Sequence, residues 1–144
     1  MRVRDWMSPD PVTVAPSTTV REARKLLRYY GVRHLPVVER DRVVGMLSDR
    51  DVRIDDGVLD LIAAASADPE EASGAMREVR LVMSSPVHVI GPEEAVEAAA
   101  RAMLSWRVSA LPVVNGQNQL LGLITTTDCL LASLSPASVP PGEG

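Results

Sequence analysis

Four runs of consecutive apolar residues dominate the hydrophobic pattern of this chain. They fall in two pairs, and a short polar segment separates the two runs of each pair, which predicts two β-hairpins. Because apolar residues do not alternate with polar ones in these runs, we expect both faces of each strand to be covered. The runs are residues 35–38 with 43–47, and residues 111–114 with 120–124.

An amphipathic helix is predicted before each hairpin. Ser17 or Thr18 is expected to cap the first helix, and Gly31 to end it. Pro92, followed by two glutamates, suits the N-terminus of the second helix. The apolar positions that recur at helical spacing are Val20, Ala23, Leu26, Leu27 and Tyr30 in the first helix and Val96, Ala99, Ala100, Met103 and Leu104 in the second.

A short β-branched run precedes each helix, at residues 12–14 and 87–90, and we expect a short strand at both places. Residues 58–65 form an apolar segment that is predicted to be helical. The last ten residues, 135–144, contain proline and glycine but no large side chain to bury, so we expect a mobile tail.

The two halves of this pattern are copies of one another. Residues 33–38 recur as residues 109–114, with Leu-Pro-Val-Val in common, and Pro36 and Pro112 give an offset of 76. The flanking blocks recur at offsets of 75 and 77. The first one-residue slip falls at Ala15, and the second in the hairpin turns, where insertions are tolerated. Three blocks in the same order indicate an internal duplication.

Composition narrows the classes of function. With 144 residues, 46% hydrophobic and 24% charged, the chain is expected to fold, and the duplication favours two half-domains. The first 72 residues carry 11 basic and 13 acidic side chains and the rest carry 4 and 6, so neither half is basic. Aromatic residues make up only 3%. We therefore expect no nucleic-acid partner.

Cysteine usage and hydropathy bear on the compartment. Cys129 is the only cysteine, which excludes an intramolecular disulfide. No apolar run approaches the roughly 20 residues that span a bilayer, and the first residues lack the apolar stretch of a secretory signal. We expect a cytoplasmic protein without a membrane partner.

These repeats resemble a tandem pair of cystathionine β-synthase (CBS) domains, also called a Bateman module. Each copy has Leu-Pro-Val-Val, then glycine, two apolar residues, Ser or Thr, and Asp three positions later. The resemblance implies an α/β (α+β) fold in which two β-α-β-β-α repeats pack as a pseudo-two-fold pair through their small sheets, with two clefts between them. The segments that carry it are residues 45–51 and 122–128, with the openings at 7–9 and 83–86.

The duplication and the resemblance together place the boundaries. The first CBS domain is predicted at residues 1–57 and the second at 81–134. A helical linker at 58–80 joins them, and a flexible Pro/Gly tail at 135–144 follows.

A hydroxyl and a carboxylate three residues later converge on one point in each copy. By resemblance, Asp51 and Asp128 hold the ribose of an adenosine-containing ligand, and Ser48 and Thr125 lie near ribose or phosphate. The chemistry agrees, because a carboxylate accepts hydrogen bonds from both ribose hydroxyls. The alternative interpretation is ordinary N-capping of the helix that begins just after each hydroxyl.

The residues that precede Leu-Pro enter the same clefts in this family, and they differ between the copies. Arg33 and His34 can donate to a phosphate, whereas Ser109 and Ala110 provide no cation. We expect the first copy to prefer the more charged nucleotide, and the second to take a nucleoside-like ligand or stay empty. Arg50 is a second phosphate candidate. The alternatives are a solvated surface charge for Arg33 and a salt-bridged helix surface for Arg50.

By resemblance, the short first strands line the adenine side of the clefts through apolar contacts and main-chain hydrogen bonds. The residues concerned are Thr13, Val14, His88 and Val89, and core packing is the alternative for the two valines. No metal site is expected at His88, because Cys129 is the only soft partner that the sequence offers.

No nucleophile elbow, P-loop or glycine-rich dinucleotide turn occurs, and no neighbouring base activates Cys129, so we predict a non-catalytic protein. The resemblance implies a regulatory module that requires no cofactor. It would bind AMP, ADP or ATP, or S-adenosylmethionine or NAD, and transmit occupancy to an effector protein of unknown identity.

The alternative function is a constitutive homodimeric scaffold with vestigial clefts. Pairs of this family usually dimerise into a disc of four CBS units, so we expect a homodimer in either case. The candidates for a self-complementary surface, which otherwise complete the chain's own core, are Ala99, Ala102, Met103, Trp106, Leu130, Leu131 and Leu134.

Overall fold

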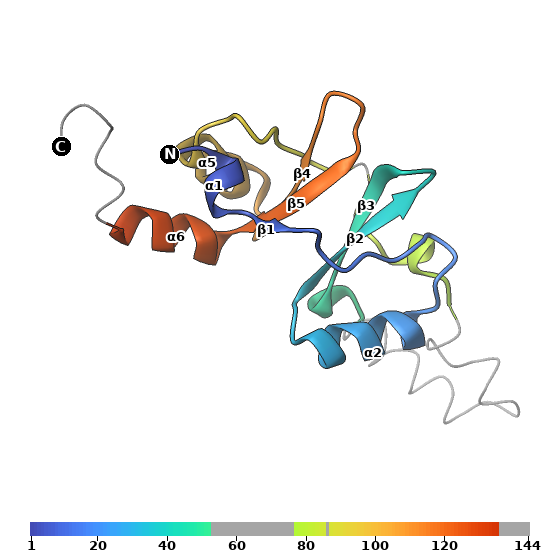
Figure 1. Cartoon of the computed structure of the whole chain (residues 1–144). Helices are drawn as coiled ribbons and strands as arrows, with labels where there is room; N and C mark the ends of the chain where they lie inside the picture. The colour runs from blue at the N-terminus through green and yellow to red at the C-terminus, as the bar shows by residue number, and fades with distance from the viewer. Residues whose placement is uncertain (53–76, 86, 136–144) are drawn as a thin grey trace, which may run out of the picture. The chain divides into compact units, whose positions relative to one another are not determined.

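The computed structural model describes residues 1–52, 77–85 and 87–135, and the helix predicted at 58–65 and the tail from residue 136 lie outside this part (Figure 1). Within it, no helix has the length and apolar character needed to cross a membrane. In chain order the elements are α1 (Val3–Trp6), β1 (Ser8–Pro9), α2 (Val20–Tyr30), β2 (His34–Glu39), β3 (Arg42–Ser48), the 3-10 helix η2 (Val79–Leu81), α5 (Val96–Trp106), β4 (Ala110–Val114), β5 (Leu120–Thr125) and α6 (Thr126–Leu134).

The chain folds into two compact units, each built around one copy of the repeat. We call them the first-repeat unit (Val12–Arg40 and Val44–Val87) and the second-repeat unit (Met1–Pro11, Asp41–Val43 and His88–Gly144). Each unit combines helices with a small sheet, so the mixed α and β class that the sequence predicts is confirmed.

Both predicted hairpins are confirmed. β2 and β3 form a two-stranded sheet, and β4 and β5 form a three-stranded sheet together with β1, in the order β1-β5-β4. In the second hairpin Ala110 pairs with Thr125 and Leu111 with Ile124. Every residue of β4 is buried, which agrees with the expectation that both faces of this strand are covered.

The short strands predicted at residues 12–14 and 87–90 are reduced to one parallel bridge each. The Val14 N–H donates to the Pro36 carbonyl at 3.1 Å, and its carbonyl accepts from the Val38 N–H at 2.9 Å. Ile90 makes the same two hydrogen bonds, to residues 112 and 114, at 3.1 and 2.9 Å. Val14 therefore corresponds to Ile90 at an offset of 76, so the slip between the copies lies before Val14 and not at Ala15.

Prolines explain why each bridge stays single. The next hydrogen bonds of a parallel ladder would need the N–H of Pro16 or Pro36 in the first repeat, and of Pro92 or Pro112 in the second. Proline has no N–H, so the ladder cannot extend in either direction. The main chain just before each bridge is left out of the sheet.

Helix α2 begins two residues later than the cap at Ser17 would require. Thr19 is the N-cap, and its side chain accepts from the Glu22 N–H at 3.2 Å, while the Thr18 hydroxyl accepts from the Ala15 N–H. The prediction of Ser17 or Thr18 as the cap was therefore wrong. Gly31 ends the helix with a φ of 63°, as expected.

Helix α5 also begins later than predicted. It starts at Val96, and the Glu94 carboxylate accepts from the Gly91 N–H at 2.7 Å before the helix begins. The buried positions of the two helices agree with the predicted spacing, except that Tyr30 and Leu104 are 52% and 80% exposed. The buried residues are Val20, Ala23 and Leu27 in α2 and Val96, Ala99 and Met103 in α5.

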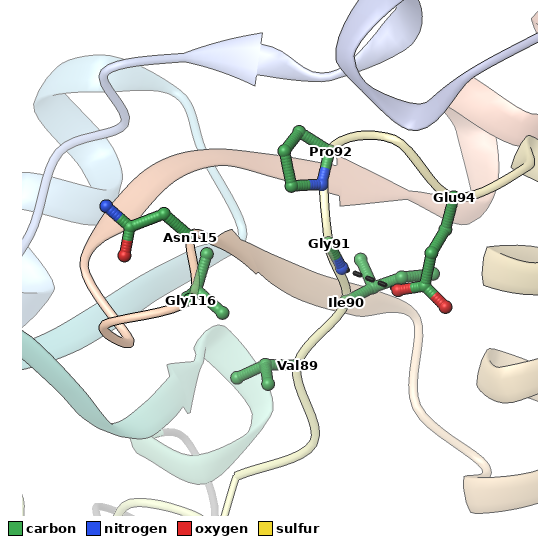
Figure 2. Close-up of a pocket in the computed structure, with 8 residues that line it drawn as sticks. Val89, Ile90, Gly91, Pro92, Glu94, Asn115 and Gly116 are labelled. Atoms are coloured by element: carbon green, nitrogen blue, oxygen red, sulfur yellow. Dashed lines mark hydrogen bonds between the residues drawn. The ribbon is translucent and has the colours of Figure 1, made fainter.

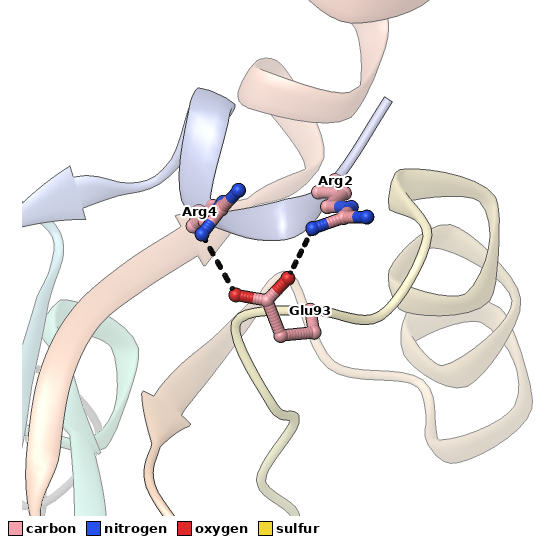
Figure 3. Close-up of polar contacts among 3 residues, drawn as sticks. All are labelled: Arg2, Arg4 and Glu93. Atoms are coloured by element: carbon pink, nitrogen blue, oxygen red, sulfur yellow. Dashed lines mark hydrogen bonds and ion pairs between the residues drawn. The ribbon is translucent and has the colours of Figure 1, made fainter.

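Residues 1–9, which we call the first leader, pack within the second-repeat unit. Val3 is fully buried in that core, and its N–H donates to the Glu94 carbonyl at 2.8 Å. Arg2 and Arg4 hold the two carboxylate oxygens of Glu93 from the same side, with 2.9 Å for the Arg4 pair (Figure 3). The leader that precedes the first repeat therefore completes the core of the second.

Residues 77–85, the second leader, pack in the same way within the first-repeat unit. Val79 is fully buried there, its N–H donates to the Thr18 carbonyl at 2.7 Å, and the Arg80 N–H donates to the Pro16 carbonyl. These bonds repeat those of the first leader at an offset of 76. The domain boundaries at 1–57 and 81–134 stay a prediction. In the structure, the second-repeat unit includes residues 1–9 and the first-repeat unit includes residues 77–85.

Two glycines, Gly45 and Gly122, allow the leaders to pack closely against the hairpins. A Cβ atom at Gly122 would lie 2.8 Å from the Ser8 carbonyl oxygen, and one at Gly45 would lie 3.1 Å from the Ser84 carbonyl oxygen. The Gly122 contact is closer than real Cβ atoms approach a backbone oxygen, and the Gly45 contact is tighter than most. The glycine of the repeated motif therefore gives the leader the space in which it packs.

Candidate functional site

The hydroxyl and carboxylate of each repeated motif meet at the start of a helix. In the first repeat, the Ser48 N–H donates to Asp51 Oδ2 at 2.9 Å, and Ser48 Oγ accepts from the Asp51 N–H at 3.1 Å. In the second, the Thr125 N–H and hydroxyl donate to Asp128 Oδ2 at 2.9 and 3.0 Å, and Thr125 Oγ1 accepts from the Asp128 N–H. Both pairs are capping boxes, as the alternative interpretation expected.

A capping box leaves one oxygen of the carboxylate without a hydrogen bond inside the box. In the described residues, the hydrogen bonds of both boxes engage only Oδ2 of the aspartate. The box also fixes the side-chain rotamer, so Oδ1 is held in one position. Both aspartates are half-buried, and an oxygen fixed in this way is suited to accept from a ligand hydroxyl.

The residues before Leu-Pro lie beside these boxes. The Asp49 N–H donates to the Arg33 carbonyl at 2.8 Å, and the Thr126 N–H donates to the Ser109 carbonyl at 3.0 Å. Each bond ties the loop before the first strand of a hairpin to the first residue of the following helix. The structure thus brings Arg33 and His34 to the Ser48–Asp51 box, and Ser109 and Ala110 to the Thr125–Asp128 box.

His34 lies in a charged environment at the first box. Burial lowers the pKa of His34 below its ordinary value of 6.5, and Arg33 lowers it further, while the carboxylates of Asp49 and Asp51 oppose both by raising it. Neutral His34 therefore predominates near pH 7. Arg33, which precedes His34, and Arg50, which precedes Asp51, are both exposed.

The second box has a different environment. Ala110 is buried and Ser109 is exposed, so these two positions bring no charge. Cys129, beside Asp128, is half-buried, and burial together with the Asp128 carboxylate raises the pKa of its thiol. The thiol therefore has little thiolate character near neutral pH.

The predicted adenine-side residues fall into two kinds. Val14 is a core residue, whereas Thr13 and His88 are exposed and Val89 is half-buried. His88 stacks face to face on Trp106, with ring centroids 3.9 Å apart and planes 8° from parallel. The sequence analysis missed this pair, since the two residues lie 18 positions apart and no sequence pattern joins them.

A pocket of about 460 Å³ lies in the second-repeat unit, away from the Thr125–Asp128 box. Asn115 and Gly116, in the turn after β4, form part of it, and Glu94 turns its carboxylate back to the Gly91 N–H (Figure 2). Thr125 pairs with Ala110 at the opposite end of β4. The pocket therefore contains neither the box nor the residues before Leu-Pro.

A family model of the CBS domain matches residues 3–54 and 76–135, so the chain belongs to the CBS domain family. Since the match covers both copies, the chain is a tandem CBS domain pair. It is 29% identical over 136 residues to the CBS domain-containing protein YhcV of Bacillus subtilis, covering 94% of this chain and 88% of YhcV.

A second relative is a longer protein. The chain is 28% identical over 143 residues to the inosine-5'-monophosphate dehydrogenase of Korarchaeum cryptofilum, covering 99% of this chain. It spans only 26% of that enzyme's length.

Solved structures share the fold. CBSX2, crystallised in complex with AMP, is 30% identical, with a TM-score of 0.75 over 92% of this chain and 96% of CBSX2. The CBS domain pair of protein MJ0100, solved with 5'-methylthioadenosine and S-adenosyl-L-methionine, is 23% identical, with a TM-score of 0.74 over 92% and 95%. At that identity, MJ0100 supports the fold alone.

Proposed function

We propose that this CBS pair is a non-catalytic regulatory module that binds adenosine-containing ligands and passes their occupancy to a partner protein. The observation that carries the proposal is the convergence, in each repeat, of a capping-box aspartate with the residues that precede Leu-Pro. The AMP complex of CBSX2, at 30% identity, supports adenosine as the shared part of the ligand.

In the first repeat the ligand is AMP, ADP or ATP. Asp51 Oδ1 accepts from the ribose hydroxyls, with Ser48 beside it, while Arg33 and His34 donate to the phosphate. Arg50 is a further donor. The base lies against the main chain at Thr13, just before the Val14 bridge, where the prolines keep the chain out of the sheet ladder.

In the second repeat the ligand carries less charge. Asp128 takes the ribose, next to Thr125, while Ser109 and Ala110 leave the phosphate position without a cation. The two sites therefore differ in the part of the ligand that they recognise beyond the ribose. No cofactor is needed for either binding step.

Exchanging the phosphate-side residues tests this proposal. Arg33→Ser gives the first repeat the residue of the second, and we expect AMP to bind it roughly 10- to 100-fold more weakly, because a charge-assisted hydrogen bond is lost. Adenosine should bind with unchanged affinity. Asp51→Asn and Asp128→Asn, measured by isothermal titration calorimetry, assign each heat to one repeat.

The reciprocal variant Ser109→Arg is the matched control, and it should raise the affinity of the second repeat for AMP. Equal AMP affinity in wild type and Arg33→Ser would contradict the assigned phosphate site. Absence of binding by AMP, ADP, ATP and adenosine alike would contradict the proposed function itself.

The exposed face of α6 supports homodimerisation, which the scaffold alternative also requires. Leu130, Leu131 and Leu134 are 63%, 55% and 81% exposed, whereas Ala99 and Met103 are buried in their own core and drop out of the predicted surface. Trp106 stays exposed and Ala102 is half-buried. Leucines in this arrangement are costly in water unless a second copy covers them.

Light scattering on the Leu130→Glu/Leu134→Glu double variant tests the dimer. We expect monomers at concentrations where the wild type is dimeric, because four carboxylates would face each other across the two-fold contact. Arg101→Glu, on the exposed side of α5, adds similar charge without removing a leucine and should leave the mass unchanged. An unaltered mass for the double variant would exclude this face.

A further inference from the structure

The exposed aromatic pair of the second repeat is not explained by folding alone. Trp106 is 44% exposed and His88 is also exposed, although the two rings stack closely. Trp106 is the last residue of α5 and lies outside the core cluster that buries Ala99 and Met103. Two flat rings thus present aromatic surface to solvent at one place.

This pair lies at the same end of the unit as the Thr125–Asp128 box. His88 precedes the Ile90 bridge by two residues, which places it level with the start of β4. Trp106 precedes Ser109 by three residues, and the Ser109 carbonyl holds the first N–H of α6. The stack and the aspartate proposed to bind ribose therefore lie at the same end of the strands.

Among the described residues of the first repeat, the corresponding positions hold no equivalent pair. Tyr30 takes the position of Trp106, but it meets Tyr29 edge-on, at 4.9 Å and 80°. At the offset of 76 set by the bridges, Val12 takes the position of His88. The first repeat therefore has Arg33 and His34 beside its capping box, whereas the second has two stacked rings at the same end of its unit.

We infer that the His88–Trp106 pair is a stacking platform for the adenine base in the second repeat, and that it selects adenine nucleosides without a phosphate. The inference rests on the proposed function. A purine gains attraction from a flat aromatic face whatever its 5' substituent is, whereas a phosphate finds no cation at Ser109 or Ala110. The ligand class is adenine nucleosides that carry no 5'-phosphate.

Arg107 is the one cation that directly follows the platform. It lies at the left-handed position that ends α5, with a φ of 56°, and it is exposed. If its side chain reached a phosphate, the second repeat would bind AMP as well as adenosine. Arg107→Ala therefore separates selection by the platform from an effect of this charge.

Trp106 fluorescence tests the platform directly. In a Trp6→Phe background, Trp106 is the only tryptophan, and 5'-methylthioadenosine should quench its emission with a stoichiometry of one per chain. Asp128→Asn should abolish the quenching, and Asp51→Asn should leave it intact. AMP should need a higher concentration than 5'-methylthioadenosine for the same quenching, in Arg107→Ala as well.

Affinity measurements complete the test. Trp106→Leu and His88→Ala should each weaken 5'-methylthioadenosine binding roughly 5- to 100-fold, the range for loss of base stacking, with AMP binding to the first repeat unchanged. Tyr30→Leu is the matched control and should change neither. Both side chains are exposed, so these variants are expected to fold.

Three outcomes would overturn the inference. Unchanged nucleoside affinity in Trp106→Leu and His88→Ala overturns it while the proposed function stands. A change of oligomeric mass in Trp106→Leu without a change in affinity assigns the pair to the dimer contact instead. If equilibrium dialysis finds no adenosine ligand bound at all, the inference and the proposed function fail together.

Discussion

The first and second repeats share a framework and differ at the positions that are proposed to face a ligand. Each repeat has a buried leader valine, a single bridge bounded by prolines and a capping box, with corresponding hydrogen bonds within a few tenths of an ångström. Next to this framework, the first repeat carries Arg33 and His34 and the second carries Ser109 and the His88–Trp106 stack.

Under the proposed function, this difference separates residues that build the fold from residues that select the ligand. Under the proposed function the aspartate of the capping box belongs to both groups, because it caps the helix that follows the strand and leaves Oδ1 outside the box for a ribose. Arg33 and Ser109 share the main-chain role of accepting from the helix, so their side chains are free to differ. A duplicated fold can in this way hold two chemically unequal sites.

Removing the first leader should destabilise one repeat relative to the other more than any other change. Deletion of residues 2–9 takes away Val3 and strand β1, so we expect the second-repeat unit to lose more than about 3 kcal/mol of stability. Amide hydrogen exchange should show lost protection in β4 and β5, and much less change in β2 and β3.

Val3→Ala and Val79→Ala form the matched pair for that deletion. Each removes a fully buried side chain from a leader, and each should cost about 2 kcal/mol in a different unit. Equal protection of both hairpins in the deletion variant would show that the leader is dispensable.

A methyl group at the two motif glycines should have the next largest effect. Gly122→Ala brings a Cβ to 2.8 Å from the Ser8 carbonyl oxygen and Gly45→Ala to 3.1 Å from that of Ser84, so we expect losses of about 1–3 kcal/mol, larger at Gly122. Gly116→Ala meets no atom within 4 Å and serves as the control. Urea unfolding measures all three, and an equal loss at Gly116 would rule out the packing explanation.

The smallest effect is the pH dependence that His34 should give the first repeat. Because the pKa of folded His34 is below its ordinary value of 6.5, the unfolded state binds the proton more readily. The contribution of His34 to stability is therefore complete above pH 6.5 and is lost as the pH falls through the folded pKa.

Chemical unfolding between pH 5 and 8 checks this dependence. His34→Gln should flatten the acid side of the profile, and the NMR titration of the two histidines should place His34 below 6.5. A His34 pKa above 6.5 would reverse the sign and contradict the desolvation argument.

Much of the framework could be predicted from the sequence, since it depends on local patterns. The hairpins follow from apolar runs around polar turns, and the stop at Gly31 from glycine's freedom at positive φ. The duplication then made the candidate site residues predictable, because the Ser48–Asp51 motif recurs as Thr125–Asp128.

The failures have a common cause in contacts between distant segments. The extended strands at 12–14 and 87–90 were expected from β propensity alone, but the ladder also depends on prolines in the partner segment. The leaders were missed as core elements, because Val3 and Val79 are buried by residues from the other repeat. The stacking of His88 on Trp106 likewise depends on tertiary structure.

Helix α6 connects the proposed ribose site to the exposed leucines. Its first turn contains Asp128 and its last turn ends at Leu134, six residues or about 9 Å along the axis. A rigid rod of this length tilts as one body, so a ligand that pulls on the first turn displaces the leucines at the far end. Under the proposed function, the helix that begins beside the ribose would transmit ligand binding to the partner that covers its C-terminal end.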